Sequence, residues 1–319
     1  MTAAAELAAR ETFADWAEEW METAIHLAHS TRSGYERQLR KRLLPAFGDV
    51  PVADITQREV RGFVAARIEA GDTPATVERA YQQLRTLLYG ALDAGLIEVN
   101  PCRRVRLPRV PQHEACFLDA AQVLALSRAI TPAYRVLILF AACTGARAGE
   151  IGGLRVARVD LTNAKVHIRE QLVFVAGRAT FGPTKTHSWR AVGLPPFLVE
   201  EMAQHLRGQP SDPDALVFTG RYGQPRQHAY FVKRHFKPAV QRAGLPAGLR
   251  FHDLRHTCAA LLIGLGAHPR AIMERLGHSK VDLTLGRYGH LFPSLDAELV
   301  NDLDEAYRRS ARESRAGRV

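Results

Sequence analysis

The sequence predicts a mainly α-helical protein of two domains, with a small antiparallel β-sheet in the second domain. A chain of 319 residues is long enough to build two hydrophobic cores. Apolar residues recur at helical spacing up to about residue 100, and again after residue 117. One stretch, residues 165–175, alternates instead and is rich in β-branched residues, which is typical of a strand.

The first domain, residues 11–105, is expected to be a bundle of four helices. Tyr35, Leu39 and Leu43 lie four apart and form one apolar stripe. Thr56 and Glu59 have the spacing of a capping box, which marks the start of a helix. Glycines follow the later apolar stripes, where helices commonly end. The three best-defined helices are predicted over residues 31–44, 56–71 and 73–95.

A basic linker is expected between the domains, over residues 106–114. The surrounding string NPCRRVRLPRVPQ has three prolines and four arginines and no apolar periodicity, so it predicts an extended segment. Such a segment can follow a phosphate backbone, because each arginine that neutralises a phosphate releases a condensed counterion. A solvated tether without a ligand is the alternative.

The second domain is expected over residues 115–293, with helices on either side of the strands. Gly182-Pro183 is predicted to be a turn within the second strand region. The expected helices are 119–130, 136–142, 198–206, 230–243, 252–265 and 269–276, and the expected strand regions are 165–175 and 178–194. Neither a βαβ alternation nor an internal repeat is present in the sequence.

The C-terminal region, residues 294–319, contains a narrow apolar stripe. Its members are spaced four apart: Leu295, Leu299, Leu303 and Tyr307. This stripe has to be buried, either on its own domain or, since it ends the chain, on a neighbouring subunit.

Composition and charge indicate a soluble protein with a polyanionic partner. The formal net charge is +10, with 46% hydrophobic residues. Residues 1–105 carry 13 basic and 15 acidic side chains (net −2), whereas residues 106–319 carry 30 and 18 (net +12). The sequence contains neither a membrane-spanning apolar run nor a secretory signal, and its four cysteines form no C-x-x-C pair. We therefore expect no membrane partner and a cytoplasmic location.

Two groups of basic residues are candidates for DNA contact. One lies on the predicted helix 31–44 and the other precedes or enters the linker; a solvated helix face is an equally good explanation of the first. The candidates are Arg32, Arg37, Arg40, Lys41, Arg103, Arg104 and Arg106.

The first two chemical motifs place a cation at a turn. In TGARAGE, a Thr-Gly turn ends an apolar helix and Arg147 starts the next segment, with Glu150 placed to cap backbone donors or to hold the arginine. In PTKTHSWRAVGLP, Lys185 lies at a predicted turn between strands, where its ammonium can swing over a ligand. Taken singly, each motif is equally compatible with a solvated surface residue.

The other two motifs lie at a helix start and a helix end. In FHDLRHTCAALL, His252 and Arg255 are three apart and share a face of an otherwise apolar helix. In LGHSKVDLTLGRYGHLFP, His278 follows a helix end and Tyr288 comes ten residues later. The string HDLRH also resembles the H-E-x-x-H helix of zinc hydrolases, but Asp253 replaces the glutamate base and no third ligand is evident.

Together these side chains suit the transfer of a phosphoryl group. Two guanidinium groups can clamp the oxygens of a phosphodiester, in place of a metal ion. A phenol, with a usual pKa of about 10, can attack phosphorus if a base or a cationic field assists it. A lysine can protonate the leaving oxygen as a general acid.

The order TGARAGE, TKTHSWR, HDLRH, LGHS and RYGH resembles the tyrosine recombinase, or phage integrase, family over residues 115–293. The resemblance implies that Arg147 and Arg255 bind the scissile phosphate and that Lys185 protonates the leaving oxygen. It implies that His252 and His278 assist proton handling and phosphate contacts, and that Glu150 supports Arg147. Tyr288 would be the nucleophile, which forms a 3′-phosphotyrosine link to DNA.

The resemblance also implies the domain roles and the partners. Residues 11–105 are similar to the core-binding (SAM-like) domain of the family, which clamps duplex DNA together with the catalytic domain. The expected partners are double-stranded recombination sites, a homotetramer on DNA that exchanges C-terminal elements, and an accessory directionality protein. No metal, ATP or other cofactor is expected.

Three questions about function stay open at this point. A catalytically silent DNA-binding relative is the first alternative, although all six candidate residues are present. A type IB-like topoisomerase, which relaxes supercoils as a monomer, is the second. The third concerns the extra N-terminal domain with which many phage integrases bind distant arm sites. Only about ten residues precede the helical domain here, which leaves arm-site binding open and favours either a simpler recombinase or a truncated integrase.

Overall fold

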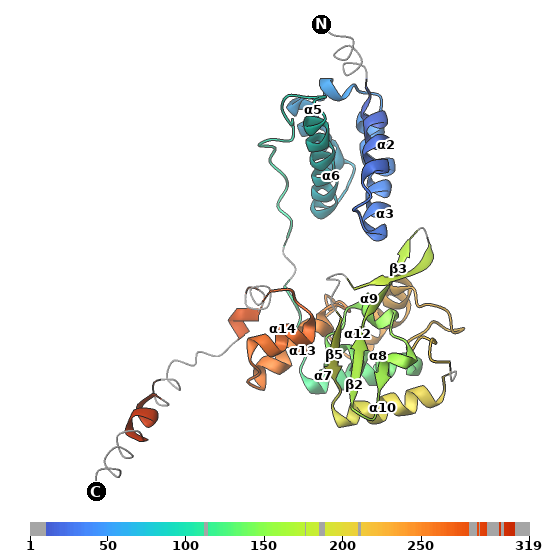
Figure 1. Ribbon diagram of the computed structural model, residues 1–319, viewed down its shortest axis with the longest axis vertical. Helices are drawn as coiled ribbons and strands as arrows, with labels where there is room; N and C mark the ends of the chain where they lie inside the picture. The colour runs from blue at the N-terminus through green and yellow to red at the C-terminus, as the bar shows by residue number, and fades with distance from the viewer. Residues whose placement is uncertain are drawn as a thin grey trace. The chain divides into compact units, whose positions relative to one another are not determined.

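The structure is a computed structural model, and it describes residues 11–111, 114–175, 177–184, 189–209, 212–280, 286, 288–291, 300 and 303–309. Contacts divide the chain into two compact units, residues 1–114 with 174–178, and residues 115–173 with 179–319. Helices make up most of both units, and strands occur only from residue 159 onward within the described residues (Figure 1). The predicted class, mainly α with a small antiparallel sheet, is confirmed.

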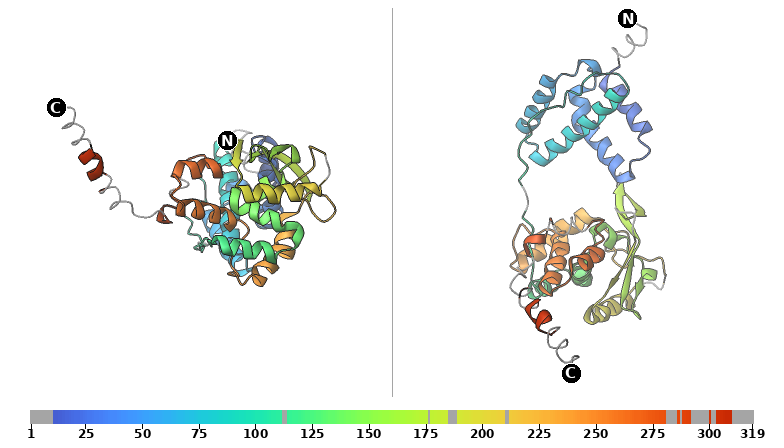
Figure 2. Two further views of the ribbon diagram at one scale, coloured as in Figure 1. Left: turned by 90° about the horizontal axis from the view of Figure 1, so that it is seen from below. Right: turned by 60° about the vertical axis from the view of Figure 1, so that its left-hand side comes forward.

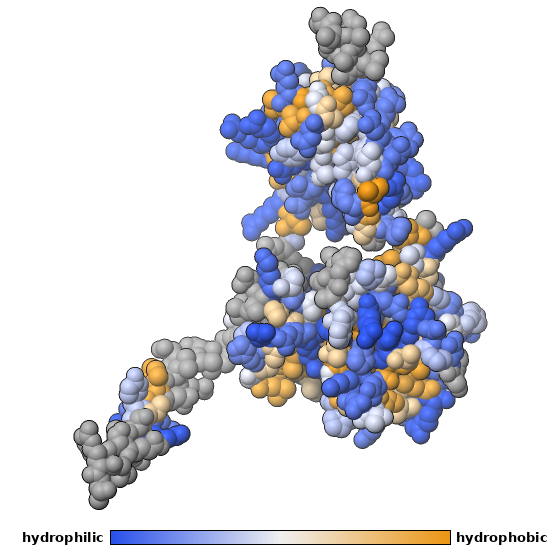
Figure 3. All heavy atoms as spheres, viewed as in Figure 1, coloured by the Kyte–Doolittle hydropathy of each residue, from blue (hydrophilic) through white to orange (hydrophobic). Residues whose placement is uncertain are grey.

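The first unit is a bundle around one apolar core. Thr12 and Asp15 cap the first helix, and Thr56 and Glu59 form the predicted capping box of α5. Its elements are α2 (Phe13–Thr23), α3 (His29–Gln38), the π-helical turn η1 (Leu39–Leu43), α4 (Leu44–Phe47), the 3-10 turn η2 (Val52–Asp54), α5 (Gln57–Glu69) and α6 (Pro74–Asp93). The helix predicted over 31–44 is therefore longer and contains a π-helical turn. Figure 3 shows hydrophilic residues over much of the visible face of each unit.

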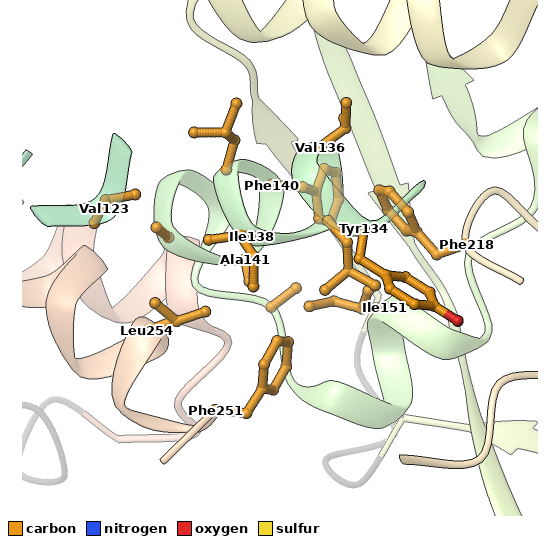
Figure 4. Packing of buried hydrophobic residues seen from close by; sticks show 14 of the residues in the cluster. Val123, Tyr134, Val136, Ile138, Phe140, Ala141, Ile151, Phe218, Phe251 and Leu254 are labelled. Carbon is orange, nitrogen blue, oxygen red and sulfur yellow. The ribbon is translucent and has the colours of Figure 1, made fainter. Parts of the chain in front are cut away.

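The second unit is built around the apolar helix α8 (Arg135–Thr144), which is buried along most of its length. Helices α7 (Ala120–Ala129), α10 (Pro196–Arg207) and α13 (Asp253–Gly264) pack against α8, as can be followed in Figures 1 and 2. Figure 4 shows Phe140 and Ile138 of α8 among Phe218, Phe251 and Leu254. The remaining helical elements are η3 (Pro132–Tyr134), α9 (Ala148–Gly152), η4 (Val156–Arg158), α11 (His228–Phe231), η5 (Val232–Phe236), α12 (Lys237–Arg242), α14 (Pro269–Leu276) and η6 (Gly289–Leu291).

The strands form two small sheets. In the first, the order is β1-β2-β5 with antiparallel pairing, and Val166 of β2 lies opposite Val192 of β5. In the second, β3 pairs with β4. The strands are β1 (Val159–Asp160), β2 (Lys165–Ile168), β3 (Glu170–Val175), β4 (Arg178–Pro183) and β5 (Arg190–Gly193).

Two details of the sequence prediction need correction. The strand predicted over 165–175 is two strands, because the chain leaves the first sheet at Arg169 and pairs elsewhere. Gly182-Pro183 is the end of β4 rather than a turn, a place where proline is tolerated in a strand. Of the predicted C-terminal stripe, Leu303 and Tyr307 are exposed, while Leu295 and Leu299 lie outside the described residues.

Within the described residues, the helices are too short or too polar to cross a membrane.

Candidate active site

The turn between α8 and α9 positions Arg147. Gly145 ends α8 in the left-handed conformation, with φ at 64°, and Arg147 is the N-cap residue of α9. The backbone N–H of Arg147 donates to Oε2 of Glu150 at 2.8 Å, and its Nη1 donates to Oε1 at 2.9 Å. The predicted pairing of Arg147 with Glu150 is therefore present.

Glu150 also binds a residue that the sequence analysis missed. Arg190, the first residue of β5, donates to both carboxylate oxygens of Glu150, at 2.7 and 3.2 Å. Both side chains are buried, with 2% of Glu150 and 9% of Arg190 exposed. Burial by itself raises the pKa of Glu150, but the hydrogen bonds and charges of Arg190 and Arg147 outweigh it and hold that pKa below its usual value.

Arg255 extends from α13 to the same turn. Its Nη1 donates to the carbonyl oxygen of Gly145 at 2.7 Å, and only 3% of the residue is exposed. Burial, and then repulsion from Arg147, lowers the pKa of Arg255 to about 9. Among the described residues, its buried Nη2 has no hydrogen-bond partner. A phosphate oxygen would satisfy this donor and offset the repulsion between the two guanidinium groups.

The end of α14 joins the same cluster. Gly277 ends this helix with φ at 67°, as the helix stop predicted before His278 requires. Nη2 of Arg147 donates to the carbonyl oxygen of Gly277 at 3.3 Å, and Nε of Arg190 donates to that of Arg275 at 2.9 Å. His278, half-buried, follows directly. Residues from four separate elements therefore meet at one place.

Tyr288 lies against α13, inside a small apolar cluster. Its side chain is completely buried, and its hydroxyl lies 2.8 Å from Nδ1 of His256. His256 directly follows Arg255 on α13, so the phenol lies beside the helix that carries this guanidinium group. His256 is the second residue that the sequence analysis missed; it considered this side chain only as a zinc ligand.

Two other predicted residues differ in their placement. His252 is exposed at the N-cap of α13, and its ring lies edge-on to that of His256, with centroids 5.1 Å apart. Lys185 lies outside the described residues. The structure thus brings together Arg147, Glu150, Arg255 and the end of α14, and adds Arg190 and His256.

The zinc-hydrolase alternative finds little support in the same helix. Asp253 is buried and accepts hydrogen bonds from the backbone and the side chain of Arg250, at 2.8 and 3.0 Å. In the part of the chain that the structure describes, His, Cys, Asp and Glu form no group of three that could hold a metal ion.

The candidate DNA-binding residues of the first unit lie on its surface. Arg37, Arg40 and Lys41 are exposed, and Arg32, half-buried, pairs with Glu36 at 3.4 Å. Arg103, Arg104 and Arg106 are exposed after the end of α6.

Comparison with protein families gives two matches along the chain. Residues 116–294 match the model of the phage integrase family, and residues 12–66 match the N-terminal SAM-like domain of phage integrases. The chain belongs to the phage integrase family. This recombinase is 30% identical to the prophage phiRv2 integrase of Mycobacterium tuberculosis over 294 residues, which are 90% of this chain and 76% of that protein. It is 29% identical to the integrase of Mycobacterium phage D29, over 92% of this chain and 78% of that one.

Solved structures of integrases share the fold. The Tn1549 transposon integrase in complex with a circular intermediate DNA matches with a TM-score of 0.78 and 20% identity, over 91% of this chain and 99% of that one. A lambda integrase tetramer bound to a Holliday junction matches with a TM-score of 0.69 and 16% identity, over 93% of this chain and 82% of that one. Relatives of the recombinase are named integrases and tyrosine recombinases, and the protein is accordingly a site-specific recombinase.

Proposed function

We propose that this recombinase cleaves and rejoins DNA through a 3′-phosphotyrosine link to Tyr288, without a metal ion or ATP. One observation carries the proposal. The guanidinium groups of Arg147 and Arg255 meet beside the turn that joins α8 and α9, and Arg255 keeps a buried donor without a partner among the described residues. The Tyr288 phenol contacts His256, the residue that follows Arg255 on α13.

The proposed chemistry assigns a role to each side chain. Arg147 and Arg255 neutralise the negative charge that develops on the phosphate oxygens in the transition state. Glu150, and through it Arg190, fixes the orientation of Arg147. Lys185 protonates the leaving 5′-oxygen, and His252 and His278 assist with proton handling and phosphate contacts.

The absence of an energy requirement follows from the covalent intermediate. The tyrosyl phosphodiester keeps the free energy of the broken bond, so the released 5′-hydroxyl can attack it and restore the backbone. Two arginines supply the positive charge that a metal ion supplies in other phosphoryl-transfer enzymes.

The proposed substrates are double-stranded recombination sites, held by both parts of the chain. Residues 11–105 act as the core-binding domain, with phosphate contacts from Arg32, Arg37, Arg40 and Lys41. Residues 106–114 form the basic linker, to which Arg103, Arg104 and Arg106 contribute phosphate contacts. Residues 115–293 are the catalytic domain, and residues 294–319 join subunits in a homotetramer on DNA. An accessory protein sets direction, and the reaction takes place in the cytoplasm.

A covalent-trapping experiment tests the proposal. The full chain is incubated, in the presence of a chelator, with nicked duplex fragments drawn from the DNA that flanks its coding region, and linked 3′ ends are mapped. We expect an adduct at one short site, with the peptide around Tyr288 carrying the nucleotide. No adduct with the wild type, or an adduct with Tyr288→Phe, would refute the proposal. Relaxation of supercoiled plasmids without a preferred site would instead indicate a topoisomerase.

A further inference from the structure

A buried histidine lies in contact with the proposed nucleophile. His256 follows Arg255 on α13, and 5% of it is exposed. Its Nδ1 lies 2.8 Å from the hydroxyl oxygen of Tyr288, with ring centroids 5.6 Å apart and planes at 63°. The residue therefore touches the atom that would attack phosphorus.

The surroundings of Tyr288 restrict where its proton can go. The phenol ring is packed among the apolar side chains of Cys258, Ile263, Ile272 and Leu276, and solvent reaches no part of it. A phenol near neutral pH is protonated, so the attack has to remove its proton. A neutral imidazole nitrogen already at hydrogen-bonding distance from the hydroxyl is suited to accept this proton.

We propose that His256 is a further catalytic residue, which accepts the Tyr288 proton during cleavage and returns it during rejoining; this inference rests on the proposed function. As the bond between the phenol oxygen and phosphorus forms, the O–H bond of Tyr288 breaks and its proton moves to Nδ1. The bond from phosphorus to the 5′-oxygen breaks, and that oxygen takes a proton from the general acid. Rejoining reverses both transfers, so atoms and charges balance.

The position of His256 suits this role. It lies on the same helix as Arg255, directly after it, so the phosphate clamp and the proton acceptor are held by one rigid element. Among the described residues, its charged and titratable neighbours include Arg255, which precedes it on α13 and is itself repelled by Arg147, and the ring of His252. These cations oppose an imidazolium, and the arriving phosphate offsets them, which couples proton transfer to DNA binding. Since the phenol is buried in the free chain, DNA has to uncover it without separating it from the imidazole.

Two variants of His256 separate proton acceptance from hydrogen bonding. His256→Asn keeps a polar atom near the position of Nδ1 but cannot take up a proton, and His256→Phe keeps a ring without a polar atom. The substrate is the duplex on which the wild type forms its adduct, made with a 5′-bridging phosphorothiolate. Its sulfur leaves without needing a proton, so the rate of adduct formation reports the attack by Tyr288 alone.

We expect both variants to form adduct about 100-fold more slowly than the wild type on this substrate, with unchanged DNA affinity. A rate near that of the wild type for His256→Asn would overturn proton acceptance. An unchanged or faster rate for His256→Phe would mean that the phenol leaves the imidazole before it attacks, which also overturns the inference. If Tyr288→Phe still formed adduct, the proposed function itself would fail, so the two failures are distinguishable.

A measurement on the wild-type protein covers the case in which the variants fail to fold. Nitrogen-15 NMR of labelled histidine reports which ring nitrogen carries the proton. We expect Nδ1 of His256 to be unprotonated in the free chain at neutral pH, and its signal to shift in Tyr288→Phe, where the hydrogen bond is lost. A protonated Nδ1 in the free chain would refute the inference.

Discussion

The carboxylate of Glu150 lies almost fully buried between two guanidinium groups, and this single residue fixes the geometry of the phosphate clamp. It binds Arg147 through the backbone and the side chain, and it binds Arg190 through both oxygens. A buried ion pair is costly to break, because removing one charge leaves the other desolvated and unpaired. The clamp and the stability of the second unit therefore depend on the same carboxylate.

Glu150→Gln is expected to lower the free energy of unfolding by about 3 kcal/mol at neutral pH. The pKa of Glu150 is lowered in the folded chain, so its charge stabilises the fold fully above its ordinary pKa of 4.5. That contribution is lost as the pH falls from there through the lowered folded value. Urea unfolding between pH 3 and pH 7 measures both effects, and the variant should lack this part of the pH dependence.

A matched control for Glu150 is Glu274→Gln. Glu274 pairs with Arg270 at 3.0 Å, but both side chains are mostly exposed, so its loss should change stability by no more than about 0.5 kcal/mol. Equal losses of unfolding free energy in the two variants would contradict the idea that the buried carboxylate of Glu150 stabilises the second unit.

Arg255→Ala is expected to lower the rate of adduct formation about 100-fold or more, because a charged donor to the transition state is removed. Affinity for the duplex should fall much less than the rate, since many other phosphate contacts hold the duplex. Single-turnover cleavage and a binding titration on the same nicked duplex separate the two quantities. The exposed Arg270→Ala is the control, and a similar loss of rate there would argue against a specific clamp.

The backbone carbonyl groups that bind the arginines of the site lie at helix ends rather than on helix faces. Gly145 ends α8 and Gly277 ends α14, both with positive φ, and the carbonyl oxygens of both accept hydrogen bonds from the arginines. A Cβ at position 277 would lie 2.8 Å from Nη1 of Arg190. The left-handed helix ends are thus required both by backbone conformation and by the close approach of the cluster.

Gly277→Ala is expected to destabilise the chain by about 2 kcal/mol or more, since it adds displacement of Arg190 to the strain of a left-handed alanine. Cleavage should fall as well, because Arg190 positions Glu150. Gly266→Ala is the matched control: its φ is 74° and nothing lies within 4 Å of the added Cβ. That variant should cost about 1 kcal/mol and cleave normally. Thermal unfolding measures the stability of the two variants, and single-turnover assays measure their cleavage rates. Normal cleavage by Gly277→Ala would contradict this role of the helix end.

Short sequence patterns predicted those contacts of the site that join residues close together in the sequence. The three-residue spacing of Arg147 and Glu150 and the glycine before His278 each determine a contact or a helix end. Arg190 and His256 were missed because their partners, Glu150 and Tyr288, lie 40 and 32 residues away. The signal for His256 was a polar residue within an apolar helix stripe, which alone does not reveal its partner.

The strands were the least predictable elements for a related reason. Alternation over 165–175 is continuous in sequence, yet the chain changes partner at Arg169, so β2 pairs with β5 and β3 with β4. Pairing is decided by strands distant in sequence, whereas a helix closes its hydrogen bonds within four residues. The helices were accordingly predicted more closely than the strands.

On the scale of the whole molecule, the proposed assembly on DNA involves the charge of the chain and its C-terminal stripe. The positive net charge of the chain, +10, comes entirely from residues 106–319, which carry +12, whereas residues 1–105 carry −2. Within the described part of the C-terminal region, Leu303 and Tyr307 are 58% and 76% exposed although they share a helix face. An apolar pair of this kind gains burial only from another surface, which the proposed homotetramer supplies.

Replacing both residues with aspartate, Leu303→Asp with Tyr307→Asp, is expected to weaken assembly on DNA while leaving one chain able to bind one site. A buried apolar anchor contributes about 2 kcal/mol to an interface, so loss of even one should raise the concentration for assembly roughly thirtyfold. Sedimentation of the chain on paired sites, beside a binding titration on a half-site, measures the two steps. Arg308→Gln lies on the same helix, in an exposed pair with Asp304, and should assemble normally. Undiminished assembly of the double variant would show that this face does not join the subunits, whereas equal loss of half-site binding would show that it contacts DNA.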